Sequence, residues 1–166
     1  MRKLLFIFIL ALSTNLSSAA PTADASVYSL IDAFKDNKRA EYHNISSLLL
    51  TAAKAAIKDN GNDLITALKS INSVQILNLD NCSGCTKRRF LSHARRVYDR
   101  NSRELIRKNK KKSFSSIQLK MDNGVVRELA IIEADGSDYS VILIKGRIPL
   151  NKLSDIINNK SKLKTK

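Results

Sequence analysis

The chain has 166 residues, 43% of them hydrophobic, which is enough for one domain with its own core. Lys and Arg number 29 against 15 Asp and Glu, so the formal net charge is +14. This excess favours an anionic partner, although a basic surface that only aids solubility is the alternative. The five glycines are scattered and form no phosphate-binding loop, and no catalytic acid–base pair or triad is visible. We therefore expect no cofactor, and the pattern favours a non-enzymatic protein.

The first residues have the three parts of a secretory signal. Arg2 and Lys3 precede the apolar run LLFIFILAL at 4–12, and Ser17 and Ala19 fit the small positions before a cleavage site. The run is short for a membrane span, which needs about 20 residues. We predict that residues 1–19 are cleaved and that the mature protein is exported, either periplasmic or secreted. No later segment predicts a transmembrane helix.

After a flexible leader at 20–25, the chain predicts a single domain at 26–159 and a basic tail at 160–166. Helices are expected from Ser26, at 48–57 and at 63–71, with a polar connection at 36–44 between the first two. The first helix has one apolar face, formed by Val27, Leu30, Ile31 and Phe34.

Strands are expected at 73–80, 114–121, 125–134 and 139–144. Asn123-Gly124 predicts a two-residue hairpin turn, because both positions of that turn need positive φ. The segment at 139–144 is almost entirely apolar, as a central strand covered on both faces would be, and we expect Gly146 and Pro149 to end it. Asn151 can begin a last helix.

A long helix is expected at 86–108, between the first and second strands. One side would pack on the sheet: Phe90, Ala94, Val97, Tyr98, Asn101 and Leu105. Another side would carry a ridge of bases: Arg89, Arg96, Arg100, Arg103 and Arg107, followed by Lys108, Lys110, Lys111 and Lys112. Arginine offers a planar fork of donors that suits phosphate or carboxylate, so this ridge is the candidate anion-binding site. The alternative is a solvated face with local ion pairs from Asp99 to Arg103 and from Glu104 to Lys108.

Taken together, the elements predict an α+β fold. N-terminal helices come first, followed by a mainly antiparallel sheet of about four strands, with the long central helix and a C-terminal helix packed on it.

The only two cysteines, Cys82 and Cys85, form a CxxC motif at the start of the long helix. This is the setting of a thioredoxin-like redox pair, with Cys82 as nucleophile and Cys85 as resolver. No aromatic residue precedes Cys82, and no proline lies just before the strand at 139–144, where that fold needs one. In an exported protein a structural disulfide is the stronger interpretation. We expect no metal site, because His43 and His93 are the only further ligands of the zinc-finger type.

Three segments carry a resemblance to a known family: YDRNSRELIR (98–107), NGVVRELAII (123–132) and YSVILIKGRIPLNKLSDII (139–157). With these motifs the chain, from about Ser26 to Asn158, resembles the small exported proteins of Bacteroides-type bacteria known as domain of unknown function 4252. The resemblance implies a signal followed by one α+β domain. It implies no activity and no catalytic residues.

The first hypothesis is an exported, non-enzymatic domain that binds an anionic partner through the ridge, either an envelope headgroup or an acidic protein. Nucleic acid is disfavoured by export and by the lack of exposed aromatic residues among the bases. The alternatives are a thiol–disulfide oxidoreductase and a structural module that docks to another envelope protein. The oligomeric state stays open.

Overall fold

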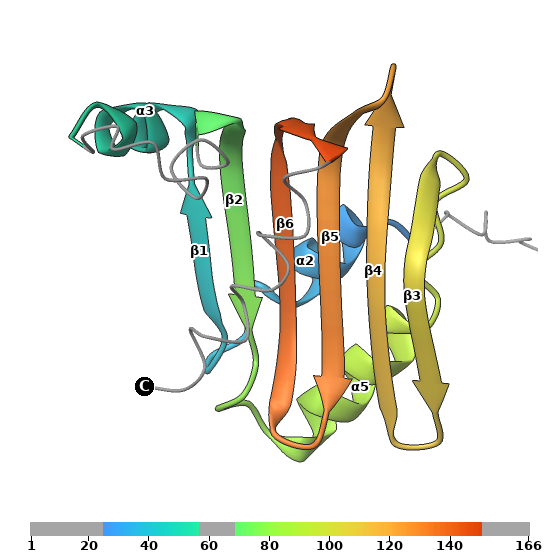
Figure 1. Cartoon of the computed structure of the whole chain (residues 1–166). Helices are drawn as coiled ribbons and strands as arrows, with labels where there is room; N and C mark the ends of the chain where they lie inside the picture. The colour runs from blue at the N-terminus through green and yellow to red at the C-terminus, as the bar shows by residue number, and fades with distance from the viewer. Residues whose placement is uncertain (1–24, 57–68, 151–166) are drawn as a thin grey trace, which may run out of the picture.

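A computed structural model describes residues 25–56 and 69–150 of the chain. Its centre is a six-stranded sheet in the order β1-β2-β6-β5-β4-β3, and each neighbouring pair is antiparallel (Figure 1). The strands are β1 Glu41–Ile45, β2 Ile71–Asn78, β3 Ser102–Lys110, β4 Ser113–Asp122, β5 Val125–Asp135 and β6 Asp138–Pro149. The last four strands form a meander, and β6 returns to pair with β2.

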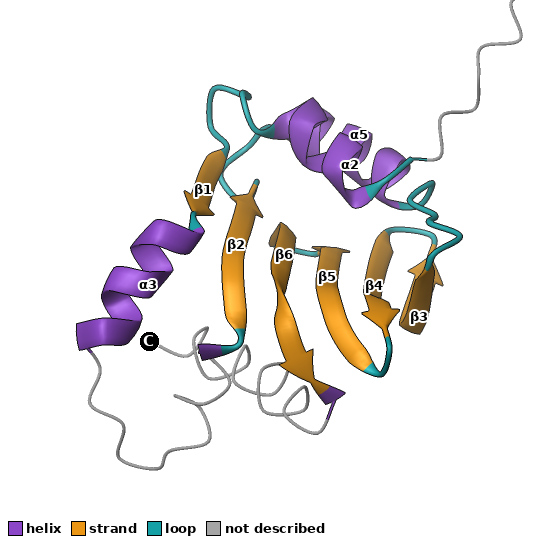
Figure 2. Ribbon diagram, turned by 90° about the horizontal axis from the view of Figure 1, so that it is seen from above, coloured by secondary structure: helices purple, strands orange, loops and turns teal. Residues whose placement is uncertain are grey.

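Helices α2 (Val27–Phe34) and α5 (Gly84–Ala94) lie together on one face of this sheet (Figure 2). Helix α3 (Ser47–Ala56) lies beside β1, at the edge of the sheet. Each packed helix begins at a serine cap, because the Ser26 and Ser83 side chains accept hydrogen bonds from the backbone N–H groups three residues later. These caps set where α2 and α5 begin.

The main core lies between the sheet and the two helices. Phe34 of α2 and Phe90 of α5 are fully buried, and their rings meet edge to face with centroids 5.4 Å apart. Burial of each ring stabilises the fold by about 2–3 kcal/mol, and the ring geometry adds about 1 kcal/mol. A second cluster covers the other face of the sheet: Ile71, Leu119, Val126, Leu129, Ile131, Ile144 and Ile148. Leu50 of α3 packs against this second cluster.

Several predicted elements are confirmed. Helix α2 buries the predicted face, α3 lies where the second helix was expected, and β2, β4, β5 and β6 overlap the four predicted strands. Asn123 and Gly124 have φ of 49° and 76°, as the predicted hairpin requires. The expected central position of β6 is also confirmed, because it lies between β2 and β5.

The end of β6 was predicted too early. The strand continues through Gly146 to Pro149. A Cβ atom at Gly146 would lie 2.2 Å from the Ser70 carbonyl oxygen, so the glycine permits a close approach of two backbones. This glycine is a packing residue inside the strand.

The prediction of a long helix at 86–108 is wrong. Helix α5 ends at Ala94, a connection follows, and the chain from Ser102 is strand β3. The arginine spacing fits a helix, but β3 pairs with β4 in an antiparallel ladder from Ser102↔Lys120 to Lys110↔Ser113, with one bulge between Glu104 and Ile106. Because β3 is an edge strand exposed at nearly every position, it has no alternation of apolar and polar residues to reveal it.

The predicted fold class is therefore corrected: the sheet has six strands instead of about four, and there is no long central helix. Strand β1 lies largely within the segment 36–44 that was predicted as a connection. The predicted signal, leader, basic tail and C-terminal helix lie outside the described residues, except for Ala25. The same holds for most of the helix expected at 63–71, of which Ile71 instead begins β2.

Candidate functional site

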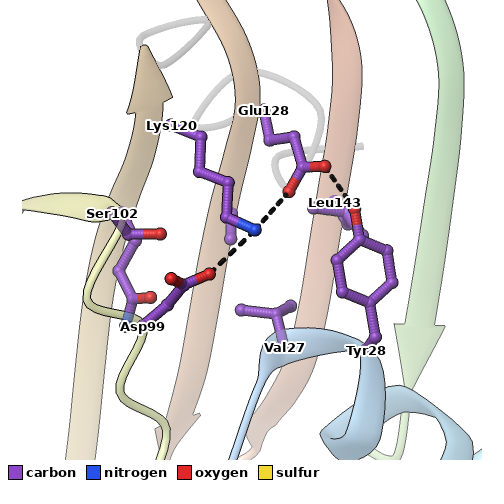
Figure 3. Close-up of a pocket in the computed structure, with 9 residues that line it drawn as sticks. Val27, Tyr28, Asp99, Ser102, Lys120, Glu128 and Leu143 are labelled. Carbon is purple, nitrogen blue, oxygen red and sulfur yellow. Dashed lines mark hydrogen bonds and ion pairs between the residues drawn. The ribbon is translucent and has the colours of Figure 1, made fainter. Parts of the chain in front are cut away.

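A polar cluster centred on Lys120 lies between α2 and the sheet (Figure 3). The Lys120 ammonium lies 2.8 Å from an Asp99 carboxylate oxygen and 3.4 Å from a Glu128 oxygen. The Tyr28 hydroxyl donates a 2.5 Å hydrogen bond to the other oxygen of Glu128. Three separate elements, α2, β4 and β5, and the connection before β3 thus meet at one cation.

The cluster shifts the pKa of three of its groups. Burial raises the pKa of the Tyr28 phenol, and its hydrogen bond to Glu128 raises it further. The hydrogen bond from Lys120 lowers the pKa of Asp99, and the same contact raises the pKa of Lys120. Both shifts favour the charged forms, in agreement with the 2.8 Å ion pair between Lys120 and Asp99.

The pocket beside these residues encloses about 20 Å³, which holds roughly one water molecule. Gln118 lines it and is only 4% exposed, and its side-chain oxygen has no hydrogen-bond partner among the described residues. A water molecule is the guest of the right size and polarity for this atom. The pocket is too small for an organic substrate.

A second polar network continues from Gln118 toward β3. The Gln118 amide donates to Ser116, and the Ser116 hydroxyl donates a 2.6 Å hydrogen bond to Glu104. The Arg107 Nε lies 2.8 Å from both oxygens of Glu104. Arg107 also donates to the Val97 carbonyl at 3.0 Å, and its guanidinium lies over the Phe114 ring. This network attaches the connection after α5 to the sheet.

The register of β3 divides its bases between the two faces of the sheet. Directly opposed residues share a face, and Arg103, Ile106, Lys108 and Lys110 oppose Leu119, Ile117, Ser115 and Ser113. Leu119 and Ile117 belong to the second core, so this row lies on the face opposite α2 and α5. Arg107 opposes Ser116 and lies on the helix-covered face. We call Arg103, Lys108 and Lys110 the basic row.

The basic row continues into the two-residue turn between β3 and β4, formed by Lys111 and Lys112. The Arg95 guanidinium donates to the carbonyl oxygens of Lys110 and Lys111, the second at 3.0 Å, and so fixes the end of α5 against this turn. Within residues 25–56 and 69–150, no ion pair is formed by the three bases of the basic row or by the two turn lysines, Lys111 and Lys112. Concentrated positive charge without ion-pair partners among the described residues is therefore a property of this stretch of β3 and its turn.

The predicted arginine ridge is not one surface. Arg89 lies on α5 with its guanidinium over Phe34, and Arg96 and Arg100 lie in the connection before β3. Arg107 is occupied by Glu104 and backbone carbonyls, whereas Arg103, Lys108, Lys110, Lys111 and Lys112 are brought together along β3 and its turn. The alternative ion pairs are also wrong, because Asp99 pairs with Lys120 and Glu104 with Arg107.

Tyr98 and Leu105 were predicted to pack on the sheet and do not. They are 60% and 46% exposed, whereas Phe90, Ala94 and Val97 are buried as expected. Sequence reasoning also missed the whole Lys120 cluster, because its members come from positions 28, 99, 120 and 128. The predicted hairpin held no signal for it, because a regular ladder around Asn123-Gly124 pairs Lys120 with Arg127, and only a register shift next to Lys120 brings it opposite Glu128.

Both cysteines are free thiols in the structure. Cys82 packs against the main core, and burial raises the pKa of its thiol, which is the reverse of an activated nucleophile. Cys85 is exposed and accepts a hydrogen bond from Arg88 at 3.2 Å. The predicted disulfide and the redox interpretation of the CxxC motif are not supported by this arrangement.

In the part of the chain that the structure describes, no three His, Cys, Asp or Glu side chains are grouped to hold a metal ion. None of the helices in that part has the length and hydropathy to cross a bilayer.

The sequence matches a protein family described as "Domain of unknown function (DUF4252)" over residues 34–156. The chain belongs to this family. No curated protein and no solved structure matches the DUF4252 chain, so its function has to be inferred from its own geometry. The matched range holds all six strands and α5, together with the basic row and three of the four residues of the Lys120 cluster.

Proposed function

We propose that this DUF4252 protein is an exported, non-enzymatic binding domain that holds an anionic partner along the basic row and the β3–β4 turn. The observation that supports it is the contrast in charge pairing around β3. Arg107 and Lys120 both have carboxylate partners, whereas Arg103, Lys108, Lys110, Lys111 and Lys112 have none among the described residues.

Grouping like charges costs stability where the bases lie within a Debye length of about 8–10 Å, as in the run from Lys108 to Lys112. Along a strand, residues two apart lie about 7 Å from each other, so Lys108 and Lys110 repel. An anionic partner removes this repulsion on binding. The partner classes that fit are an acidic protein and an anionic envelope headgroup.

The test is binding to two anionic probes, poly-L-glutamate and vesicles that contain phosphatidylglycerol, at about 50 and 200 mM salt. We expect binding at low salt and a loss of about tenfold in affinity at the higher salt, because surface charges are screened. A protein that binds neither probe at low salt would overturn the proposal.

The variant is Lys111→Gln with Lys112→Gln, which removes two charges from the turn. Its matched control is Lys38→Gln with Arg147→Gln, which removes two exposed charges from the β1–β2–β6 side of the molecule. We expect the turn variant to bind at least fivefold more weakly than the control. Equal losses of affinity in the turn variant and the control would show that net charge alone attracts the probes.

A further inference from the structure

Strand β3 presents an open backbone edge. It is the last strand in the sheet order, and no strand in the described part of the chain lies beside its outer edge. All its residues from Arg103 to Lys110 are exposed. An open edge offers a row of N–H and C=O groups that can pair with another extended chain.

The side chains around this edge are those of a protein-binding surface. Leu105 and Ile106 are 46% and 43% exposed, and Tyr98 in the preceding connection is 60% exposed. Aromatic and apolar side chains next to arginine are typical of contact centres between proteins. A headgroup layer would use the bases and the apolar side chains but would leave the backbone edge unpaired.

A second copy of the chain is a poor occupant of the edge. Strand β3 has four bases and one acid, a net charge of +3, and its acid is held by Arg107 and Ser116. Two such strands side by side would place like charges together, which is destabilising.

We propose that β3 accepts an extended, acidic peptide segment of a partner protein as a seventh strand of the sheet. Backbone hydrogen bonds supply the pairing, and acidic side chains at alternate positions of the peptide lie beside Arg103, Lys108 and Lys110. The same bases that reject a basic strand thus select an acidic one.

This inference deepens the proposed function, and it rests on the proposed function for the charge of the partner. It adds a mode of binding that charge alone does not require. The proposed function and the peptide inference can therefore fail separately.

The probe is a capped nine-residue peptide of alternating Glu with Val or Thr, used with the full mature chain. Binding is measured by fluorescence anisotropy, and amide hydrogen exchange is measured for β3 and for β1 at the opposite edge. We expect the peptide to slow exchange of β3 amides at least tenfold and to leave β1 unchanged. A peptide with Lys in place of Glu should not bind.

Backbone pairing is tested without any change to the protein. Two further peptides keep the same charges but carry N-methyl groups at alternate residues, one in each of the two frames. In at least one frame the methyl groups remove the N–H groups that face β3, so we expect at least a tenfold loss of affinity. If both methylated peptides bind as well as the parent, strand pairing is excluded and only charge attraction remains.

The matched variants are Arg103→Gln with Lys108→Gln and the control Lys38→Gln with Arg147→Gln. We expect the first pair to weaken peptide binding about tenfold and the control pair less than twofold. If phosphatidylglycerol vesicles bind the protein and the peptide does not, the peptide inference is overturned while the proposed function stands. If no anionic probe binds at low salt, both are overturned.

Discussion

Arg107 and Lys108 are neighbours on β3, but they face opposite sides of the sheet and differ in every contact. Arg107 binds Glu104 and the Val97 carbonyl and lies over the Phe114 ring. Lys108 has no such contact among the described residues and lies in the basic row. The helix-covered face of β3 is thus a structural surface with paired charges, whereas the bases on the other face and in the turn have no ion-pair partner among the described residues.

This comparison shows that a basic residue in a charge-rich segment is not evidence of a binding site by itself. The register of the strand decides which bases are paired within the fold and which are left unpaired. Four variants test the division, ordered by their expected effect on the free energy of unfolding.

The largest effect is expected from Phe90→Ala. The ring is fully buried between α5 and the sheet and contacts Phe34, so its loss leaves a cavity in the main core. We expect a loss of about 3–5 kcal/mol in the free energy of unfolding, measured by urea denaturation. The control is Leu105→Ala at the exposed edge, which should cost less than about 1 kcal/mol. Similar losses for both would show that β3 is buried in the folded protein.

How far the sequence predicts this fold depends on where each element lies. Strands β5 and β6 have both faces covered, so their apolar content and the Asn123-Gly124 turn were sufficient to locate them. Helix α2 was equally clear, because its buried face repeats at helical spacing.

The edge strands were not predictable in this way. In β3 nearly every side chain is exposed, so no burial pattern marks it, and its arginines recur at spacings that also suit a helix. Pairing with β4 decides the outcome, and that pairing is a tertiary contact. The Lys120 cluster depends on the same contacts, because Asp99 reaches Lys120 only when β3 lies beside β4.

The second-largest loss in the free energy of unfolding is expected from Lys120→Met. The change leaves the partly buried Asp99 and Glu128 carboxylates without their shared cation, so we expect a loss of about 2 kcal/mol at pH 7. Asp99→Asn together with Lys120→Met should cost less than the sum of the two single changes. Additive losses would contradict the ion pair.

The same pair predicts a pH dependence. The lowered pKa of Asp99 contributes stability that is present above its ordinary value of 3.8 and is lost as the pH falls through the lower folded value. The raised pKa of Lys120 contributes stability that is present below its ordinary value of 10.5 and is lost as the pH rises through the higher folded value. Between these limits the pair should stabilise the wild type evenly, and both losses should shrink in Lys120→Met.

A smaller effect is expected from Arg107→Ala, compared with Lys108→Ala. Arg107 is partly exposed, so its pairing with Glu104 is screened, and we expect a loss of about 1–2 kcal/mol that includes its contact with Phe114. Lys108→Ala should change stability by less than about 0.5 kcal/mol. In the poly-L-glutamate titration the order should reverse, with Lys108→Ala the weaker binder. A loss of binding for both variants, or for neither, would contradict the division of β3 into two faces.

The smallest of the four effects is expected from Tyr28→Phe. The hydroxyl donates to Glu128 in a partly buried setting, and its removal should cost about 1 kcal/mol. The matched control is Tyr98→Phe, because Tyr98 is mostly exposed and the change should cost nothing measurable.

An absorbance titration distinguishes a lost hydrogen bond from a packing defect. Burial and Glu128 raise the pKa of the Tyr28 phenol, so this phenol should ionise at a higher pH than a free tyrosine, whose ordinary value is 10.0. The change in absorbance near 295 nm that accompanies this late ionisation should be absent from Tyr28→Phe and present in Tyr98→Phe. If the late step persists in Tyr28→Phe, the phenol that carries it lies elsewhere, and the link from α2 through Glu128 to Lys120 would have to be withdrawn.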